Sequence, residues 1–263
     1  MTDPCPEGFI EFASQLADAN GAHVLGYFQT PLAVESKDDD SPVTAADLEG
    51  EQIMRRMIRE RYPDHGIAGE EFPPEREDAE YLWLLDPIDG TAAFVAGAPG
   101  FGTLIALLRA RRPILGVIDS PVLKQRWLGA QGRPTTLDGK PVRVRACQDL
   151  SQAILSCASP HYFHGRHREA YERLAERVWL PSYGQFCYAY GLLASGFVDI
   201  VTDGGMKPHD YFPLMPIVEG AGGVITDWKG EALSFEPADR VVAAGNRRLL
   251  DEALEVLAEE GEV

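Results

Sequence analysis

Apolar side chains recur at helical spacing in two stretches near the start of the chain. Over residues 7–28 they are Phe9, Phe12, Leu16 and Ala19. A second helix is predicted from a capping box formed by Thr44 and Asp47, and Pro63 prevents its continuation. The three aspartates at 38–40 indicate a loop before it. We therefore expect two amphipathic helices joined by a polar segment.

Short apolar runs follow and predict strands. The run at 81–86 predicts a buried strand that ends in Asp86-Pro87. The runs at 101–109, 113–120 and 125–130 are joined by turn-like segments, so they predict an antiparallel meander. We expect residues 1–147 to form an α+β half with an antiparallel sheet.

Strands and helices alternate after about residue 148. The predicted strands are 153–159, 198–203, 223–228 and 240–245, and the predicted helices are 167–178, 184–195, 210–221 and 247–259. Such alternation is typical of α/β structure, so we expect residues 148–263 to form an α/β half.

Composition narrows the class of protein. With 263 residues, 45% of them hydrophobic, the chain can bury a sizeable core, which excludes intrinsic disorder. The formal net charge of −17 argues against nucleic acid or an anionic membrane as a partner. No apolar run approaches the length of a membrane span, and residues 1–20 lack the pattern of a signal peptide. Four scattered cysteines without CxxC pairs favour core thiols in a reducing cytoplasm.

The most informative segment is DPIDGT at residues 86–91. Asp86 and Asp89 stand three apart at the end of the predicted strand, Pro87 restricts the backbone and Gly90 frees it. Two carboxylates presented together suit a hard divalent cation such as Mg²⁺. If a short helix begins here, the amides of Gly90 and Thr91 can bind phosphate. The alternative is a simple turn, since Asp, Pro and Gly are common turn residues.

Two further acidic elements accompany this segment. Glu70 and Glu71 follow an apparent strand, although adjacent glutamates on a loop are usually only solvated. Asp210 stands where a helix is predicted to begin, where it could serve only as a favourable N-terminal charge. His209 beside it could support a ligand or simply pack.

These elements resemble the inositol monophosphatase superfamily in order and spacing. The matching segments are D-x-SPVT-x-AD (39–47), GEE (69–71), DPIDGT (86–91) and the aspartate with EGAGG (210–223), which together cover essentially the whole chain. The resemblance implies a layered αβαβα sandwich, a homodimer, and a Mg²⁺-dependent phosphomonoester hydrolase that uses a metal-activated water. A non-catalytic relative that retains the fold is the alternative from another class.

The resemblance also implies roles for individual residues. Two or three Mg²⁺ ions would be bound by Glu70, Asp86, the carbonyl of Ile88, Asp89 and Asp210. Asp47 would hold the hydroxyl of Thr91, and Thr91 with Glu70 would orient and activate the water. The phosphate would lie on Asp89, Gly90 and Thr91.

Several segments resemble the histidinol-phosphatase branch, which implies a role in histidine biosynthesis. They are 101–108, 113–129, 187–201 and 206–230. The leaving-group pocket would include Gln185, Phe186, Asp203 and Asp210. The chain departs from the branch at Phe186, where the branch usually has aspartate, at Asp203, where relatives have glutamate, and at the small Ala92 and Ala93. Because of these departures, inositol 1-phosphate or another sugar or polyol phosphate stays an alternative substrate.

A run of histidines needs its own interpretation. His161, His164 and His167 stand three apart, but Pro160 and Gly165 argue against a regular helix face. We expect a solvated or phosphate-adjacent loop here rather than a transition-metal site.

Overall fold

The computed structural model describes residues 3–31, 33–36, 42–236 and 238–258, so the aspartate run 38–40 lies outside the described residues. Both predicted N-terminal helices are confirmed, as α1 (Glu7–Tyr27) and α2 (Ala45–Arg61). The capping box is also confirmed: the hydroxyl of Thr44 accepts from the N–H of Ala46, and the Thr44 N–H donates to Asp47. A small antiparallel pair, β1 (Val34–Ser36) and β2 (Pro42–Thr44), precedes α2.

A seven-stranded sheet follows, and its strands lie in sequence order. They are β3 (Gly66–Gly69), β4 (Tyr81–Asp89), β5 (Gly102–Arg109), β6 (Arg112–Ser120), β7 (Gln125–Ala130), β8 (Thr136–Leu137) and β9 (Lys140–Pro141). The predicted meander is confirmed, because every neighbouring pair is antiparallel except β3 with β4. The short helix α3 (Thr91–Val95) begins directly after β4.

The second half forms a mixed five-stranded sheet in the order β11-β10-β12-β14-β13. Its strands are β10 (Ile154–Cys157), β11 (Leu180–Tyr183), β12 (Ile200–Gly204), β13 (Val224–Asp227) and β14 (Arg240–Ala244). Strand β10 runs parallel to β11 and β12, whereas β14 is antiparallel to both of its neighbours. The helices are α4 (Arg166–Arg177), α5 (Phe186–Ala194), α6 (Pro208–Tyr211), α7 (Leu214–Gly220) and α8 (Arg247–Ala258), with 3₁₀ turns at Leu150–Gln152 and Pro160–Tyr162.

Two features of this half differ from the sequence prediction. The single helix expected at 210–221 is divided into α6 and α7, because Pro213 has no N–H to continue the hydrogen-bond ladder between them. Strand β11 was not predicted. It is four residues long and contains Pro181, which a sheet tolerates at an edge strand such as this one.

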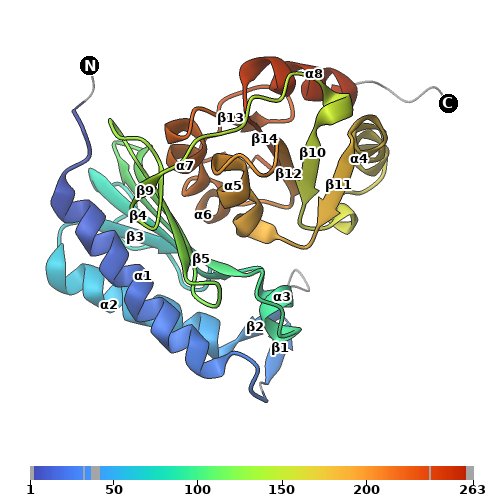
Figure 1. Cartoon of the computed structure of the whole chain (residues 1–263). Coiled ribbons are helices and arrows are strands. Elements are labelled where there is room, and N and C mark those ends of the chain that lie inside the picture. The colour runs from blue at the N-terminus through green and yellow to red at the C-terminus, as the bar shows by residue number, and fades with distance from the viewer. Residues whose placement is uncertain (1–2, 32, 37–41, 237, 259–263) are drawn as a thin grey trace.

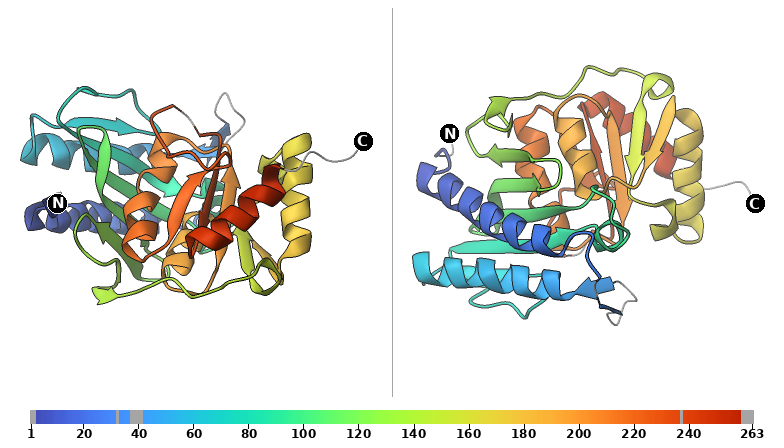
Figure 2. Two further views of the ribbon diagram at one scale, coloured as in Figure 1. Left: turned by 90° about the horizontal axis from the view of Figure 1, so that it is seen from above. Right: turned by 60° about the horizontal axis from the view of Figure 1, so that its bottom comes forward.

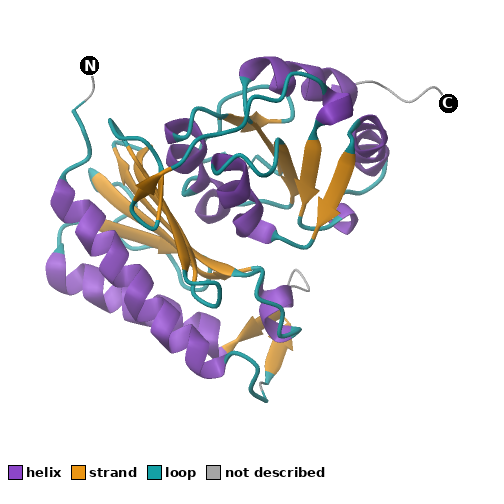
Figure 3. Cartoon of the chain, in the orientation of Figure 1, coloured by secondary structure: helices purple, strands orange, loops and turns teal. Residues whose placement is uncertain are grey.

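The elements stack as five layers, which Figure 1 shows along their edges and Figure 3 shows by type of element. The order is α1 with α2, the seven-stranded sheet, α5 with α6 and α7, the five-stranded sheet, and α4 with α8; the turned views of Figure 2 agree. Alternation along β4 separates two cores: Trp83 and Leu85 pack against α1 and α2, whereas Leu82 and Leu84 face the middle layer. The αβαβα sandwich is therefore confirmed.

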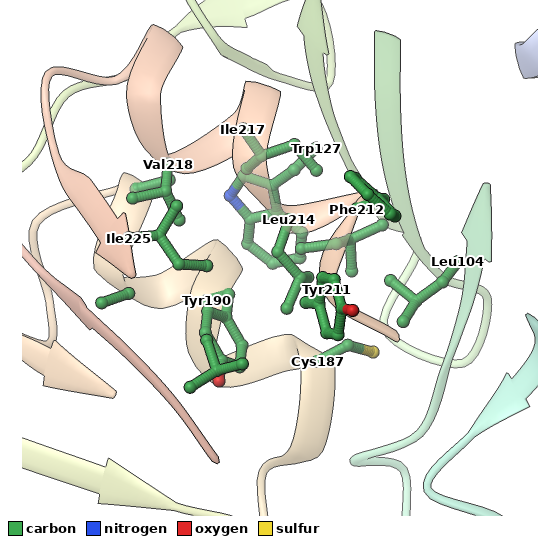
Figure 4. Packing of buried hydrophobic residues seen from close by; sticks show 14 of the residues in the cluster. Leu104, Trp127, Cys187, Tyr190, Tyr211, Phe212, Leu214, Ile217, Val218 and Ile225 are labelled. Carbon is green, nitrogen blue, oxygen red and sulfur yellow. The ribbon is translucent and has the colours of Figure 1, made fainter. Parts of the chain in front are cut away.

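The middle core joins the two halves of the chain. Figure 4 shows Trp127 of β7 beside Leu214 and Ile217 of α7 and Leu104 of β5 near Phe212, and all five belong to one buried cluster. The four cysteines are free and buried, in agreement with their interpretation as core thiols. Within the described residues, no helix is both long enough and apolar enough to cross a membrane.

Candidate active site and metal centre

A bulge in β4 brings Asp86 and Asp89 to the same side of the sheet. In a regular strand, residues three apart point to opposite faces. Here Asp86 pairs with Leu104 but Asp89 pairs with Gly102, so β4 carries one residue more than β5. Such a bulge redirects the following side chain. The strand therefore extends to Asp89, beyond the predicted end at Asp86, and DPIDG is more than a surface turn.

Asp210 completes the acidic cluster from the other half of the chain. Carboxylate oxygens of Asp86, Asp89 and Asp210 all lie within 4.8 Å of one another. Asp210 is in the first turn of α6, where its Oδ2 accepts from the N–H of Lys207 at 2.7 Å. Its Oδ1 lies 3.4 Å from Nε2 of His209, so that histidine contacts a member of the acidic cluster. Glu70 lines the same cavity.

Crowding and burial raise the proton affinity of these acids. Burial raises the pKa of Asp86 well above its usual range, and the charges of the neighbouring carboxylates raise it further. Burial and the charge of Asp210 also raise the pKa of Asp89, although the N–H of Cys187 donates to its Oδ2 at 2.6 Å. Several carboxylates gathered in one partly dry site favour a multivalent cation that would neutralise them.

Thr91 is held between Asp47 and the bulge. Its hydroxyl oxygen lies 3.3 Å from Oδ1 of Asp47 and 3.0 Å from the carbonyl of Ile88, so it can donate to either. Asp47 is 1% exposed, and burial raises its pKa. Its other oxygen accepts from the N–H and hydroxyl of Thr44, so one carboxylate both caps α2 and contacts Thr91. The two sequence interpretations of Asp47 are therefore compatible.

Gly90 cannot be replaced without strain. Its φ of +84° lies in the left-handed region, and a Cβ would stand 2.8 Å from the Phe186 ring. Gly90 and Thr91 are the N-cap and first residue of α3, so their N–H groups have no earlier carbonyl of that helix to bind. The backbone here offers donors on a surface that a side chain at Gly90 would cover.

The site opens into a cavity of about 440 Å³. Beyond the acids, its wall includes Phe186, Tyr162, Met206, Lys207 and His164. Rings and a thioether therefore stand beside the carboxylates and suit an apolar or cationic group, while Lys207 adds one basic side chain to the wall.

Asp203 lies in the cavity wall and is 6% exposed. Its oxygens accept from the N–H of Ala158 at 2.6 Å and the hydroxyl of Tyr190 at 3.1 Å. Burial raises the pKa of Asp203 to about 6. Each oxygen keeps a second lone pair with which it can bind a donor in the cavity.

The structure does not bring every predicted pocket residue to the cavity. Gln185 is absent from the described cavity wall, and its amide instead bonds Ser156 and Ser182. Ala92 lines the cavity, whereas Ala93 is buried beneath it.

The three histidines do not gather into one site. His164 lines the cavity, His167 lies 3.3 Å from Arg240, and His161 is exposed. Among the residues that the structure describes, the group of three or more candidate metal ligands is Asp86 with Asp89 and Asp210.

Sequence reasoning missed Asn20, which supports the bulge from behind. Its Nδ2 lies 2.9 Å from the carbonyl of Pro87 and 2.7 Å from Oγ1 of Thr103, and the residue is fully buried. A signal was present: Asn20 is a polar residue on the apolar face of α1, between Leu16 and Val24. Nothing in local spacing, however, connects it to residue 87.

Comparison with known proteins agrees with this geometry. A sequence model described as the inositol monophosphatase family matches residues 6–262. The chain is 46% identical over 98% of its length to a bifunctional phosphatase IMPL2, chloroplastic, of Arabidopsis thaliana, and covers 77% of that protein. It is 34% identical to a histidinol-phosphatase of Chlorobaculum parvum, over 90% of this chain and 92% of that one. A solved inositol monophosphatase from Zymomonas mobilis is 40% identical and superposes with a TM-score of 0.89, over 96% and 98% of the two chains.

Proposed function

Because the chain belongs to the inositol monophosphatase family, whose members are metal-dependent phosphatases, we propose that this phosphatase uses Mg²⁺ to hydrolyse histidinol phosphate to histidinol and phosphate. The observation that carries the proposal is the acidic cluster of Asp86, Asp89 and Asp210, which lines a cavity together with aromatic, acidic and basic side chains. Intact ligands argue against a non-catalytic relative.

The donor set fits Mg²⁺. All of the clustered atoms are carboxylate oxygens, which hard divalent cations prefer, and Ile88 lies in the wall of the same cavity. We propose that Glu70, Asp86, Ile88, Asp89 and Asp210 share two or three ions. When bound, such ions neutralise phosphate oxygens and lower the pKa of water.

The chain's own groups orient the reactants. The N–H groups of Gly90 and Thr91 bind the phosphate of the substrate, together with a metal ion that Asp89 would hold. The Thr91 hydroxyl and the Glu70 carboxylate orient the attacking water, and Glu70 accepts its proton. Asp47 fixes the direction of Thr91. Water then attacks phosphorus in line as the P–O bond to the alcohol breaks, and the leaving oxygen takes up a proton that balances the one accepted by Glu70. The phosphoryl group passes directly to water, so no side chain becomes phosphorylated.

The leaving group lies toward Asp203. A histidinol leaving group carries an ammonium and an imidazole, and the Asp203 carboxylate with the rings of Phe186 and Tyr162 gives both a charge partner and aromatic faces. Relatives named histidinol-phosphatases at 34% and 36% identity support this choice. Inositol 1-phosphate, or another sugar or polyol phosphate, is the second candidate. It is supported by the lack of a carboxylate at position 186, where the histidinol-phosphatase branch usually has aspartate, and by the likeness to an inositol monophosphatase.

A phosphate-release panel tests both candidates. We expect Mg²⁺-dependent release that EDTA abolishes, with a higher kcat/KM for histidinol phosphate than for inositol 1-phosphate. Turnover without metal would contradict the mechanism. Equal kcat/KM on the two substrates would contradict both narrow assignments, whereas no turnover on any phosphomonoester would favour the non-catalytic alternative.

We also propose that the protein is a homodimer of the cytoplasm. Trp179 and Phe197 are each 64% exposed, and Leu180 and Tyr183 of the edge strand β11 are also exposed, so large apolar side chains are available for contact with a second chain. Sedimentation should give twice the mass of one chain. Trp179→Glu with Phe197→Glu should give the mass of one chain with an unchanged circular dichroism spectrum.

A further inference from the structure

One face of α2 carries a line of buried charges. Asp47, Glu51 and Arg55 follow one another at intervals of four, so they lie on the same side of the helix. They are 1%, 0% and 2% exposed. Asp47 contacts Thr91, but Glu51 and Arg55 line no part of the described cavity.

Glu51 binds the segment that follows Glu70. Its Oε2 accepts from the N–H of Glu71 at 2.8 Å, and its Oε1 accepts from Nε of Arg55 at 2.6 Å. A Cβ on Gly69 would stand 2.2 Å from that Oε1, so the absence of a side chain there lets the chain approach the carboxylate. The residues on both sides of Glu70, Gly69 and Glu71, therefore lie against the Glu51 carboxylate.

Arg55 binds the same segment a little further along the chain. Its Nη2 donates to the carbonyl of Phe72 and its Nη1 to Oε1 of Glu75, each at 2.9 Å. On the other side, the N–H of Glu70 donates to the carbonyl of Leu85 on β4 at 3.1 Å. Glu70 is thus held between strand β4 and helix α2, with its carboxylate at the cavity.

We propose that Glu51 and Arg55 are positioning residues that fix the backbone around Glu70 and so aim its carboxylate at the acidic cluster. The catalytic consequence rests on the proposed function. One helix face then sets both groups that orient the attacking water: Thr91 through Asp47, and Glu70 through Glu51 and Arg55. A buried ion pair is poor evidence for stability by itself, because an apolar pair can often replace it. Glu51 and Arg55 both contact the short segment 71–75, which a positioning role explains.

Asp199 provides a matched control. Its side chain is fully buried, accepts from a backbone N–H (Ile154, 2.8 Å) and pairs with an arginine, as Glu51 does, although this arginine (Arg145) is 41% exposed and Arg55 is 2% exposed. It lies just before β12 and is not part of the described cavity wall. Asp199→Asn removes the same kind of buried charge without touching the Glu70 segment.

The test compares Glu51→Ala and Glu51→Gln with Asp199→Asn in the full chain. We expect Glu51→Ala to lower kcat about tenfold to 100-fold while KM changes less than about twofold, because a misplaced group slows the reaction more than it weakens binding. Glu51→Gln, which leaves one carbonyl oxygen for two donors, should lose less. Asp199→Asn should lower the melting temperature but keep the wild-type kcat. Wild-type kcat in Glu51→Ala, or an equal loss in Asp199→Asn, would overturn the inference; if Glu51→Ala does not fold, the same criteria apply to Glu51→Gln.

Hydrogen exchange without metal or substrate separates this inference from the proposed function. The amides of Glu70, Glu71, Phe72 and Glu75 should exchange faster in the Glu51 variants than in wild type and should be unchanged in Asp199→Asn; residues 73 and 74 are prolines and have no exchangeable amide. Unchanged exchange in the Glu51 variants would overturn the positioning role even if the enzyme is active. Absence of phosphatase activity in wild type would instead count against the proposed function, and the exchange result would still decide whether Glu51 fixes the segment.

Discussion

Asp89 contributes both a negative charge and a hydrogen-bond acceptor to the site. Its carboxylate is near Asp86 and Asp210, and its Oδ2 accepts from the N–H of Cys187. Asp89→Asn removes one negative charge but keeps an oxygen that can accept this bond. We expect phosphate release to fall roughly 10²- to 10³-fold, since a charge-stabilising group is lost.

The stability of the same variant separates loss of chemistry from loss of fold. In EDTA at neutral pH its melting temperature should equal or exceed that of wild type, because mutual repulsion is relieved. A large drop would mean that Asp89 is mainly structural. Asp251→Asn, an exposed acid of α8, should leave both activity and stability unchanged.

Phe186 tests the substrate assignment. The residue has a φ of +44°, a region that aspartate adopts more readily than phenylalanine, so Phe186→Asp should not strain the backbone further. The added carboxylate lies in the cavity wall near the leaving group and should attract an ammonium. We expect the ratio of kcat/KM for histidinol phosphate to that for inositol 1-phosphate to rise about tenfold, as roughly 1.4 kcal/mol of added attraction would give. An unchanged ratio would place the leaving group away from Phe186.

At the scale of elements, the connection between β4 and α3 positions the residues of the site, because the bulge of β4 and the first turn of α3 follow each other directly. The capping box and the meander could be predicted from sequence because they depend on neighbouring residues. The bulge could not, because its register is set by the pairing of β4 with β5. Likewise, the division of α6 from α7 follows from Pro213, but β11 forms only because β10 is there to pair with it.

Gly90→Ala tests this connection. The left-handed φ costs about 1–3 kcal/mol for a residue with a side chain, and the contact with the Phe186 ring adds to it. Gly139→Ala is the control, because Gly139 also has a positive φ (+75°) but a Cβ there meets nothing within 4 Å. We expect Gly90→Ala to lose more stability than the control in urea unfolding and to lose phosphatase activity as well. Equal stability losses and normal activity would show that the close approach is unimportant.

At the scale of the molecule, a few of the acids behind the net charge of −17 gather in the acidic cluster. Asp210 joins the cluster from beyond residue 147, and the middle core contains residues from both halves. The division of the chain at residue 147 stays a prediction. The site, however, needs both parts, since neither holds the full set of clustered acids.

Metal and proton should compete for this cluster. The raised pKa of Asp89, about 7 against an ordinary 3.8, means that without metal the acid favours folding below about pH 4 and loses that contribution as the pH rises through 7. Asp86 shifts in the same direction. The rise in melting temperature that Mg²⁺ produces over EDTA should therefore be larger at about pH 8 than at about pH 5. Thermal unfolding at both values measures this difference, and a rise independent of pH would argue against Mg²⁺ at these acids.

The sequence by itself determined most helices and strands, the acidic motifs and their resemblance to a family, because periodicity, caps and turns depend on residues close along the chain. The tertiary structure decided which of these groups meet. Asp210 lies close to Asp86, Gln185 bonds Ser156 and is absent from the described cavity wall, and Glu51 accepts from the N–H of Glu71. Such contacts depend on how layers pack across the whole molecule, which no local pattern encodes.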